Sequence, residues 1–129
     1  MIFAVAGLSG NGVIRAAKEC QKFVVGVDSD QDHMAKGYVL TSVMKRLDNA
    51  VYKEVSGTLR DGFESGSIRY GLSNNGMELS PMKYTKDLIS SVTLKKLQDV
   101  ENCIRKGDLK VADFTGFEQD EDEKTGKQR

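Results

Sequence analysis

Apolar runs and helix-like stretches alternate in the first part of the chain. Residues 2–6 are apolar at every position, and a second apolar run leads to Asp28. Such runs are typical of strands in a parallel sheet whose two faces are covered by helices. Between the two runs, one helical face collects the residues Val13, Ile14, Ala17 and Cys20. We therefore predict a right-handed βαβ unit with its first strand in the interior of a sheet.

The middle of the chain continues this alternation. Residues 38–46 read as a strand or an extended crossover. Asp48 is well placed to cap a following helix, and Gly62 is well placed to end it. Apolar and polar side chains then alternate over residues 67–72, which predicts a half-exposed strand.

The last predicted elements follow the pair Asn75-Gly76, the strongest turn signal in the chain. Apolar residues at helical spacing predict a helix over residues 91–106, which Gly107 would end in the left-handed conformation. A short strand is predicted over residues 108–114. Strands that alternate with helices indicate an α/β fold. Because few strands are apolar on both faces, we expect part of a larger fold, or a protomer that completes its core with another chain.

Composition restricts the partners of this chain. It has 129 residues, of which 39% are hydrophobic and 29% charged, as in a globular domain. The 19 basic and 19 acidic side chains balance, which gives no electrostatic reason to expect nucleic acid or an anionic membrane. No apolar run reaches the ~18–20 residues of a membrane span. The first residues also lack the basic start of a secretory signal.

Cysteine and histidine are scarce. Cys20 and Cys103 lie far apart in the sequence and read as unpaired thiols. With His33 as the only histidine, a closed zinc site has too few ligands, so we predict no metal and no cofactor. Residues 118–129 contain no apolar side chain, so we predict a disordered charged tail from residue 117 to residue 129.

The glycine-rich turn GLSGNG, residues 7–12, is the first candidate for chemistry. Its spacing, G-x-x-G-x-G, reverses the dinucleotide fingerprint G-x-G-x-x-G. No Gly-Lys-Ser/Thr follows, which excludes a P-loop. Three interpretations stay open: a turn that only needs a positive φ, a turn whose backbone contacts a ligand, and a dinucleotide site.

Asp28 is the second candidate, because it ends the second apolar strand. Ligands of open parallel sheets bind at the carboxyl ends of strands, so we expect Asp28 to lie near the Gly7 turn. A carboxylate there suits a vicinal sugar diol, although a turn or helix cap is an equal alternative. Asp30 and Asp32 read as parts of a solvated loop. A hydrolytic carboxylate pair would lack a partnered nucleophile or histidine.

Four segments carry a resemblance to a known family. In this order and spacing, FAVAGLSGNGVIRAAKE, VVGVDSDQD, VLTSVMKRLDNAVY and GLSNNGMELSP resemble the basic membrane protein family of bacterial lipoproteins. Those proteins are purine-nucleoside receptors that serve ABC-type importers. The resemblance covers residues 2–112. One departure is Leu8, where the family has a second glycine, since leucine disfavours a positive φ.

The resemblance implies a type I periplasmic-binding architecture, in which three crossovers join two α/β lobes of parallel sheet layers flanked by helices. Residues 1–37 would end the second lobe, and residues 38–46 would be an interlobe crossover. Residues 47–116 would end the first lobe. The chain would thus be an incomplete, C-terminal part of the two-lobe fold.

The resemblance also implies a ligand site. By motif position, Asp28 resembles the carboxylate that binds the ribose, and Lys45 the lysine that reaches the sugar. Gly7 would offer backbone beside the ligand, and Phe3 is a candidate for aromatic contact. The alternatives are a surface lysine at position 45 and a core aromatic at position 3.

The implied function is binding of a purine nucleoside for delivery to an ABC permease, without enzymatic chemistry. Family members are lipid-anchored outside the cell membrane, whereas the missing signal sequence also fits a cytoplasmic location. A regulatory or interaction protein on the same scaffold is the main alternative, followed by a dinucleotide-dependent enzyme. Exposed apolar edges would favour a homodimer.

Overall fold

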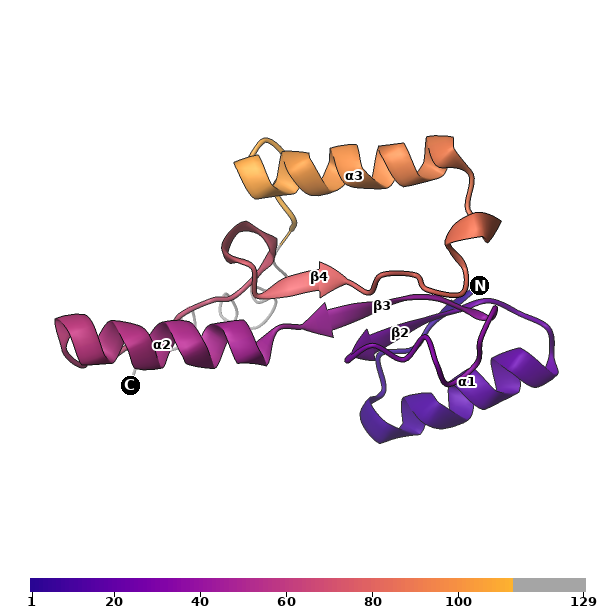
Figure 1. Cartoon of the computed structure of the whole chain (residues 1–129), viewed down its shortest axis with the longest axis horizontal. Coiled ribbons are helices and arrows are strands. Elements are labelled where there is room, and N and C mark those ends of the chain that lie inside the picture. The colour runs from indigo at the N-terminus through magenta and orange to yellow at the C-terminus, as the bar shows by residue number, and fades with distance from the viewer. Residues whose placement is uncertain (113–129) are drawn as a thin grey trace, which may run out of the picture.

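The computed structural model describes residues 1–112 as a four-stranded sheet with helices around it (Figure 1). Across the sheet the order is β1 (Ile2–Phe3), β2 (Val24–Asp28), β3 (Val39–Lys45) and β4 (Met77–Leu79). The first three strands are parallel, and β4 pairs antiparallel with β3. The predicted α/β class, a mostly parallel sheet flanked by helices, is confirmed.

The βαβ unit forms as predicted, with helix α1 (Gly10–Glu19) between β1 and β2. Ile14 and Ala17 of α1 are buried in a small apolar core with Ala4, Val24, Ala35 and Val39. Each fully buried Val or Ile side chain contributes about 1.5–3 kcal/mol, so this core anchors α1 on the sheet. Cys20 caps the end of α1 and is exposed, and both it and Cys103 are free thiols.

Strand β1 is not the interior strand that the sequence predicts. It has two residues, and both Ile2 and Phe3 are exposed. Among residues 1–112, β1 pairs only with β2 and is therefore an edge strand. Within the apolar run, Ala4 packs into the core, whereas Ile2, Phe3 and Val5 are not covered by other described residues.

Helix α2 (Leu47–Asp61) follows β3 directly and ends at Gly62, where φ is 91°, as predicted. The predicted cap at Asp48 is wrong, because Arg46 precedes the helix and Asp48 lies in its first turn. The Arg46 guanidinium donates to Asp48 at 2.9 and 2.6 Å and to Glu78 of β4 at 2.7 Å. Asp48 is thus engaged by a side chain and does not cap the backbone.

Much of α2 lacks a packing partner in the described part of the chain. Figure 1 shows it projecting away from the sheet. Its apolar face borders a shallow groove of about 650 Å³ and consists of Leu47, Val51, Tyr52, Val55 and Leu59, all exposed. Within residues 1–112, no helix combines the length and the apolar character needed to cross a membrane.

The strand predicted over residues 67–72 is wrong. This segment is irregular and leads into a 3₁₀ turn at Leu72–Asn74. The Asn74 side chain accepts from Gly71 N–H at 2.7 Å and donates to the Arg69 carbonyl at 3.0 Å. Such local side-chain bonds give the backbone an alternative to strand pairing. The predicted turn at Asn75 is confirmed by its φ of 61°.

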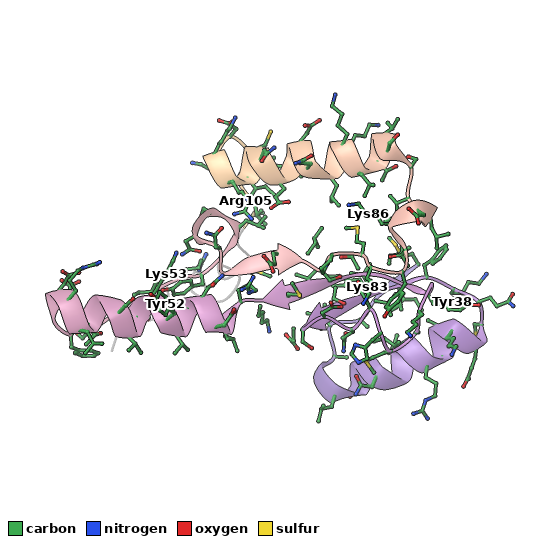
Figure 2. The ribbon with its side chains drawn as sticks, viewed as in Figure 1. Tyr38, Tyr52, Lys53, Lys83, Lys86 and Arg105 are labelled. Atoms are coloured by element: carbon green, nitrogen blue, oxygen red, sulfur yellow. The ribbon has the colours of Figure 1, made fainter. Side chains whose placement is uncertain are left out.

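Helix α3 (Ser91–Lys106) matches its prediction, with Ser90 Oγ accepting from Thr93 N–H at 3.2 Å and Gly107 ending it at φ 83°. Figure 2 shows Arg105 directed from α3 toward the 3₁₀ turn, where it donates to Asn75 Oδ1 at 3.0 Å. The strand predicted from residue 108 does not form through residue 112. The predicted tail at residues 117–129 lies outside the described residues.

Candidate ligand-binding site

Three strand ends define the candidate site. Gly7 follows β1, Asp28 ends β2 and Lys45 ends β3, and these strands are parallel neighbours. All three residues therefore lie at one edge of the sheet, where open parallel sheets bind their ligands. A hollow of about 400 Å³ opens there, lined by Gly7, Leu8, Asn11, Asp28, Asp30 and Gln31 among others.

Asp28 and Lys45 form an ion pair at these strand ends; Asp28 lines the hollow, whereas Lys45 is not among the residues that line it. Lys45 Nζ lies 2.7 Å from Asp28 Oδ1, and their side chains are 57% and 47% exposed respectively. An ion pair this exposed contributes at most about 1 kcal/mol to stability. Its groups stay accessible, so together they offer a ligand an acceptor and a charged donor.

The backbone at Asp28 is left-handed, with φ of 72°, which is uncommon for a residue other than glycine. Ser29 N–H donates to the Val27 carbonyl across Asp28 at 3.0 Å, the bond of a three-residue γ-turn. Asp28, the last residue of β2, is therefore held in a tight turn that ends the strand.

The Gly7 turn has a specific backbone requirement. Gly7 has φ of 51°, a conformation that glycine adopts without the steric cost of a Cβ atom. It opens a short 3₁₀ segment, Gly7–Ser9, that leads straight into α1. The next residue, Leu8, is almost fully exposed beside the hollow. The conformation explains glycine at position 7.

Phe3 lies on β1 with 56% of its surface exposed. It does not line the hollow, and within the described residues it is no core aromatic either. Its contact with a ligand stays a prediction. Among residues 1–112 no three His, Cys, Asp or Glu side chains gather as metal ligands would.

The reading of Asp32 as a solvated loop residue is wrong, since Asp32 is only 2% exposed. Its carboxylate accepts from Ser80 Oγ at 2.8 Å and from Lys83 N–H at 3.2 Å. Ser80 Oγ in turn accepts from Ser42 N–H at 2.9 Å. This network joins the loop after β2 to the segment after β4.

Gln31 is the residue of this site that sequence reasoning missed. Its side-chain oxygen accepts from the N–H of Val27, the residue before Asp28, at 3.0 Å. A lone glutamine in a polar loop has no signature of its own. Two signals were available: Gln31 lies in the segment VVGVDSDQD that carries the family resemblance, and Gly26 leaves space that the Gln31 side chain occupies.

Two solved structures share the fold of this chain, a mostly parallel sheet flanked by helices. One is described as a transcriptional activator of the comK gene from Bacillus halodurans (TM-score 0.75, 16% identity). The match covers 84% of this chain and 38% of that structure's chain. The other is an ABC transporter system solute-binding protein from Aeropyrum pernix K1 (TM-score 0.72, 22% identity), with 86% and 40% covered. At these identities the likeness concerns the fold alone.

The family model for Bmp, described as ABC transporter substrate-binding protein PnrA-like, matches residues 1–114. The chain belongs to this family. It is 36% identical to Basic membrane protein D of Borreliella burgdorferi, over 86% of this chain and 33% of that protein. It is 35% identical to the CD4+ T-cell-stimulating antigen of Listeria innocua, over 86% and 35%. The chain thus spans about a third of these relatives.

Proposed function

We propose that this chain supplies one wall of a purine-nucleoside site in a solute-binding protein that delivers its ligand to an ABC permease. The observation that carries the proposal is the exposed Asp28–Lys45 pair beside the hollow at the strand ends. A ribose diol both donates and accepts hydrogen bonds. The Asp28 carboxylate can accept from its hydroxyl groups, and the Lys45 ammonium can donate to their oxygens.

Binding in this proposal involves no chemistry on the ligand. The turn at Gly7 would border the sugar with backbone, and Phe3 would offer its ring to the base. A ligand site normally buries most of its ligand, so the one wall present here needs a facing lobe. Closure of two lobes about a hinge would complete the site. We also propose an extracytoplasmic, lipid-anchored location for the protein that carries such a site; membership of the substrate-binding family supports this location.

A fusion protein tests this proposal. The part of Basic membrane protein D that precedes its first residue aligned with this chain would be joined to residues 1–129 of this chain. Calorimetric titration with adenosine, guanosine and NAD then reports the ligand class. We expect the fusion to bind a nucleoside and to ignore NAD, and the isolated chain to bind far more weakly. Heat from NAD without heat from either nucleoside, in a cooperatively melting fusion, would overturn the assignment.

A second candidate, a regulatory protein on the same scaffold, rests on the fold shared with the transcriptional activator from Bacillus halodurans. That function would still use ligand-driven closure, but its partner would not be a permease. Crosslinking of the nucleoside-loaded fusion to an ABC permease encoded in the same genome as this chain separates the two candidates. Specific capture supports transport, and its absence favours regulation.

A further inference from the structure

The backbone of β2 loses its outer partner just before Asp28. Ala4 N–H donates to the Val25 carbonyl at 3.1 Å, which is the last bond between the β1 side and β2. Backbone groups of a strand face the same neighbour at every second residue. The N–H and carbonyl of Val27 therefore point to this same edge, past the point where β1 can pair with them.

Two groups of the following turn satisfy these polar groups of Val27. Gln31 Oε1 accepts from Val27 N–H at 3.0 Å, and Ser29 N–H donates to the Val27 carbonyl at 3.0 Å. Gln31 thus takes the place of a missing strand partner. Because the chain must fold back for Gln31 to reach Val27, the same bond keeps Asp28 in its left-handed turn, at φ of 72°.

Besides its bond to Val27, Gln31 contacts two further residues. Its own N–H donates to Ser42 Oγ at 3.0 Å, and Nε2 lies 3.5 Å from Asn11 Oδ1 of α1. Ser42 is fully buried in β3. A Cβ atom at Gly26 would lie 2.5 Å from Gln31 Oε1 and 2.8 Å from Ser42 Oγ, which real structures do not tolerate. The absence of a side chain at Gly26 therefore leaves the space that the Gln31 side chain occupies.

We propose that Gln31 is a positioning residue of the candidate site. It acts through Asp28: by binding Val27 N–H it fixes the turn that aims the Asp28 carboxylate at Lys45. Its oxygen is committed to the backbone and does not need to contact the ligand. The effect on affinity rests on the proposed function, whereas the effect on the turn is independent of any ligand.

Amide hydrogen exchange on the 129-residue chain tests the turn directly. Gln31→Met keeps the side-chain length and removes the acceptor, and Gln98→Met is the matched control because Gln98 is an exposed glutamine on α3. We expect Gln31→Met to reduce protection of the Val27 amide about tenfold, the equivalent of one lost hydrogen bond, while the β3 amides keep theirs. Unchanged Val27 protection in Gln31→Met would overturn the inference.

A double-mutant cycle in the fusion protein tests whether Gln31 acts through Asp28. Gln31→Met alone should weaken adenosine binding about tenfold. In an Asp28→Ala background it should have no further effect. An equal loss in both backgrounds would mean that Gln31 contacts the ligand itself, and would overturn the positioning role. If Asp28→Ala alone leaves affinity unchanged, the proposed ribose site fails, and the exchange result alone decides the role of Gln31 in the turn.

Discussion

At the residue scale, the Asp28–Lys45 pair is the central feature. Its two side chains come from the ends of neighbouring strands, meet at 2.7 Å and remain about half exposed. A pair of this kind adds little to stability, whereas the proposed function gives it a role, because a ribose would use both groups. The strained backbone at Asp28 supports this explanation, because such strain persists where the surrounding structure enforces it.

Asp28→Ala in the fusion protein should lower nucleoside affinity by about 1–3 kcal/mol, because polar groups of the ligand would lose their acceptor. Calorimetric titration measures the change. Asp99→Ala is the matched control, since Asp99 is an exposed aspartate on α3. Equal affinities of Asp28→Ala and the unaltered fusion would remove Asp28 from the site.

Asp48 gives a prediction on pH. Hydrogen bonds from Arg46 lower the pKa of Asp48 from 3.8 to about 2. Because the folded-state pKa is depressed, the contribution of this pair to stability is present above about pH 4 and is lost as the pH falls toward 2. NMR titration of the Asp48 carboxyl carbon should show this midpoint, and Arg46→Met should return it toward 3.8. A midpoint near 3.8 in the unaltered chain would contradict the pairing.

The sequence revealed part of this site. Asp28 and Gly7 follow apolar runs, so their places at strand ends follow from pattern alone, and Lys45 came from the family resemblance. The support could not be predicted in the same way. Gln31 and Asp32 are polar residues in a polar loop, and their burial depends on Ser42 and Ser80 from distant strands.

At the scale of elements, sequence patterns predicted correctly those helices whose formation depends on interactions between residues close in the sequence. Helices α1 and α3 carry apolar stripes, and α3 has its own cap and stop, so both form as predicted. The strand predicted over residues 67–72 failed because Asn74 binds the nearby backbone. The predicted burial of β1 is wrong for a different reason, because within residues 1–112 β2 is its only strand neighbour.

Ser90→Ala should destabilise the chain by about 1 kcal/mol, because α3 would lose the acceptor for Thr93 N–H. Chemical denaturation measures the free energy of unfolding. Ser90→Asp is the control, as aspartate also caps helices well and should stay within about 0.5 kcal/mol. Indistinguishable stabilities of Ser90→Ala and the unaltered chain would show that the cap does not contribute.

At the scale of the whole molecule, the described part is rich in uncovered apolar surface. The apolar face of α2 and the edge strand β1 are both exposed. Surfaces of this kind are typical of interfaces, and an open strand edge invites pairing. In the proposed function, a facing lobe would cover part of this surface and supply the second wall of the site.

The isolated chain should self-associate through α2, and light scattering should give a mass above that of a monomer. Val51→Asp places a charge on this face and should shift the chain toward monomer. Val92→Asp is the control, because Val92 on α3 is as exposed as Val51, at 63% against 61%. A monomer at every concentration, with cooperative melting, would contradict this use of the α2 face.

The most direct test of the account compares adenosine with 2′,3′-dideoxyadenosine on the fusion protein by calorimetric titration. The two ligands share a base and differ in the diol that Asp28 and Lys45 are proposed to bind. The account predicts that the dideoxy ligand binds at least about tenfold more weakly, and that Asp28→Ala removes most of this difference. Equal affinity for the two ligands in the unaltered fusion would contradict a sugar site at these strand ends.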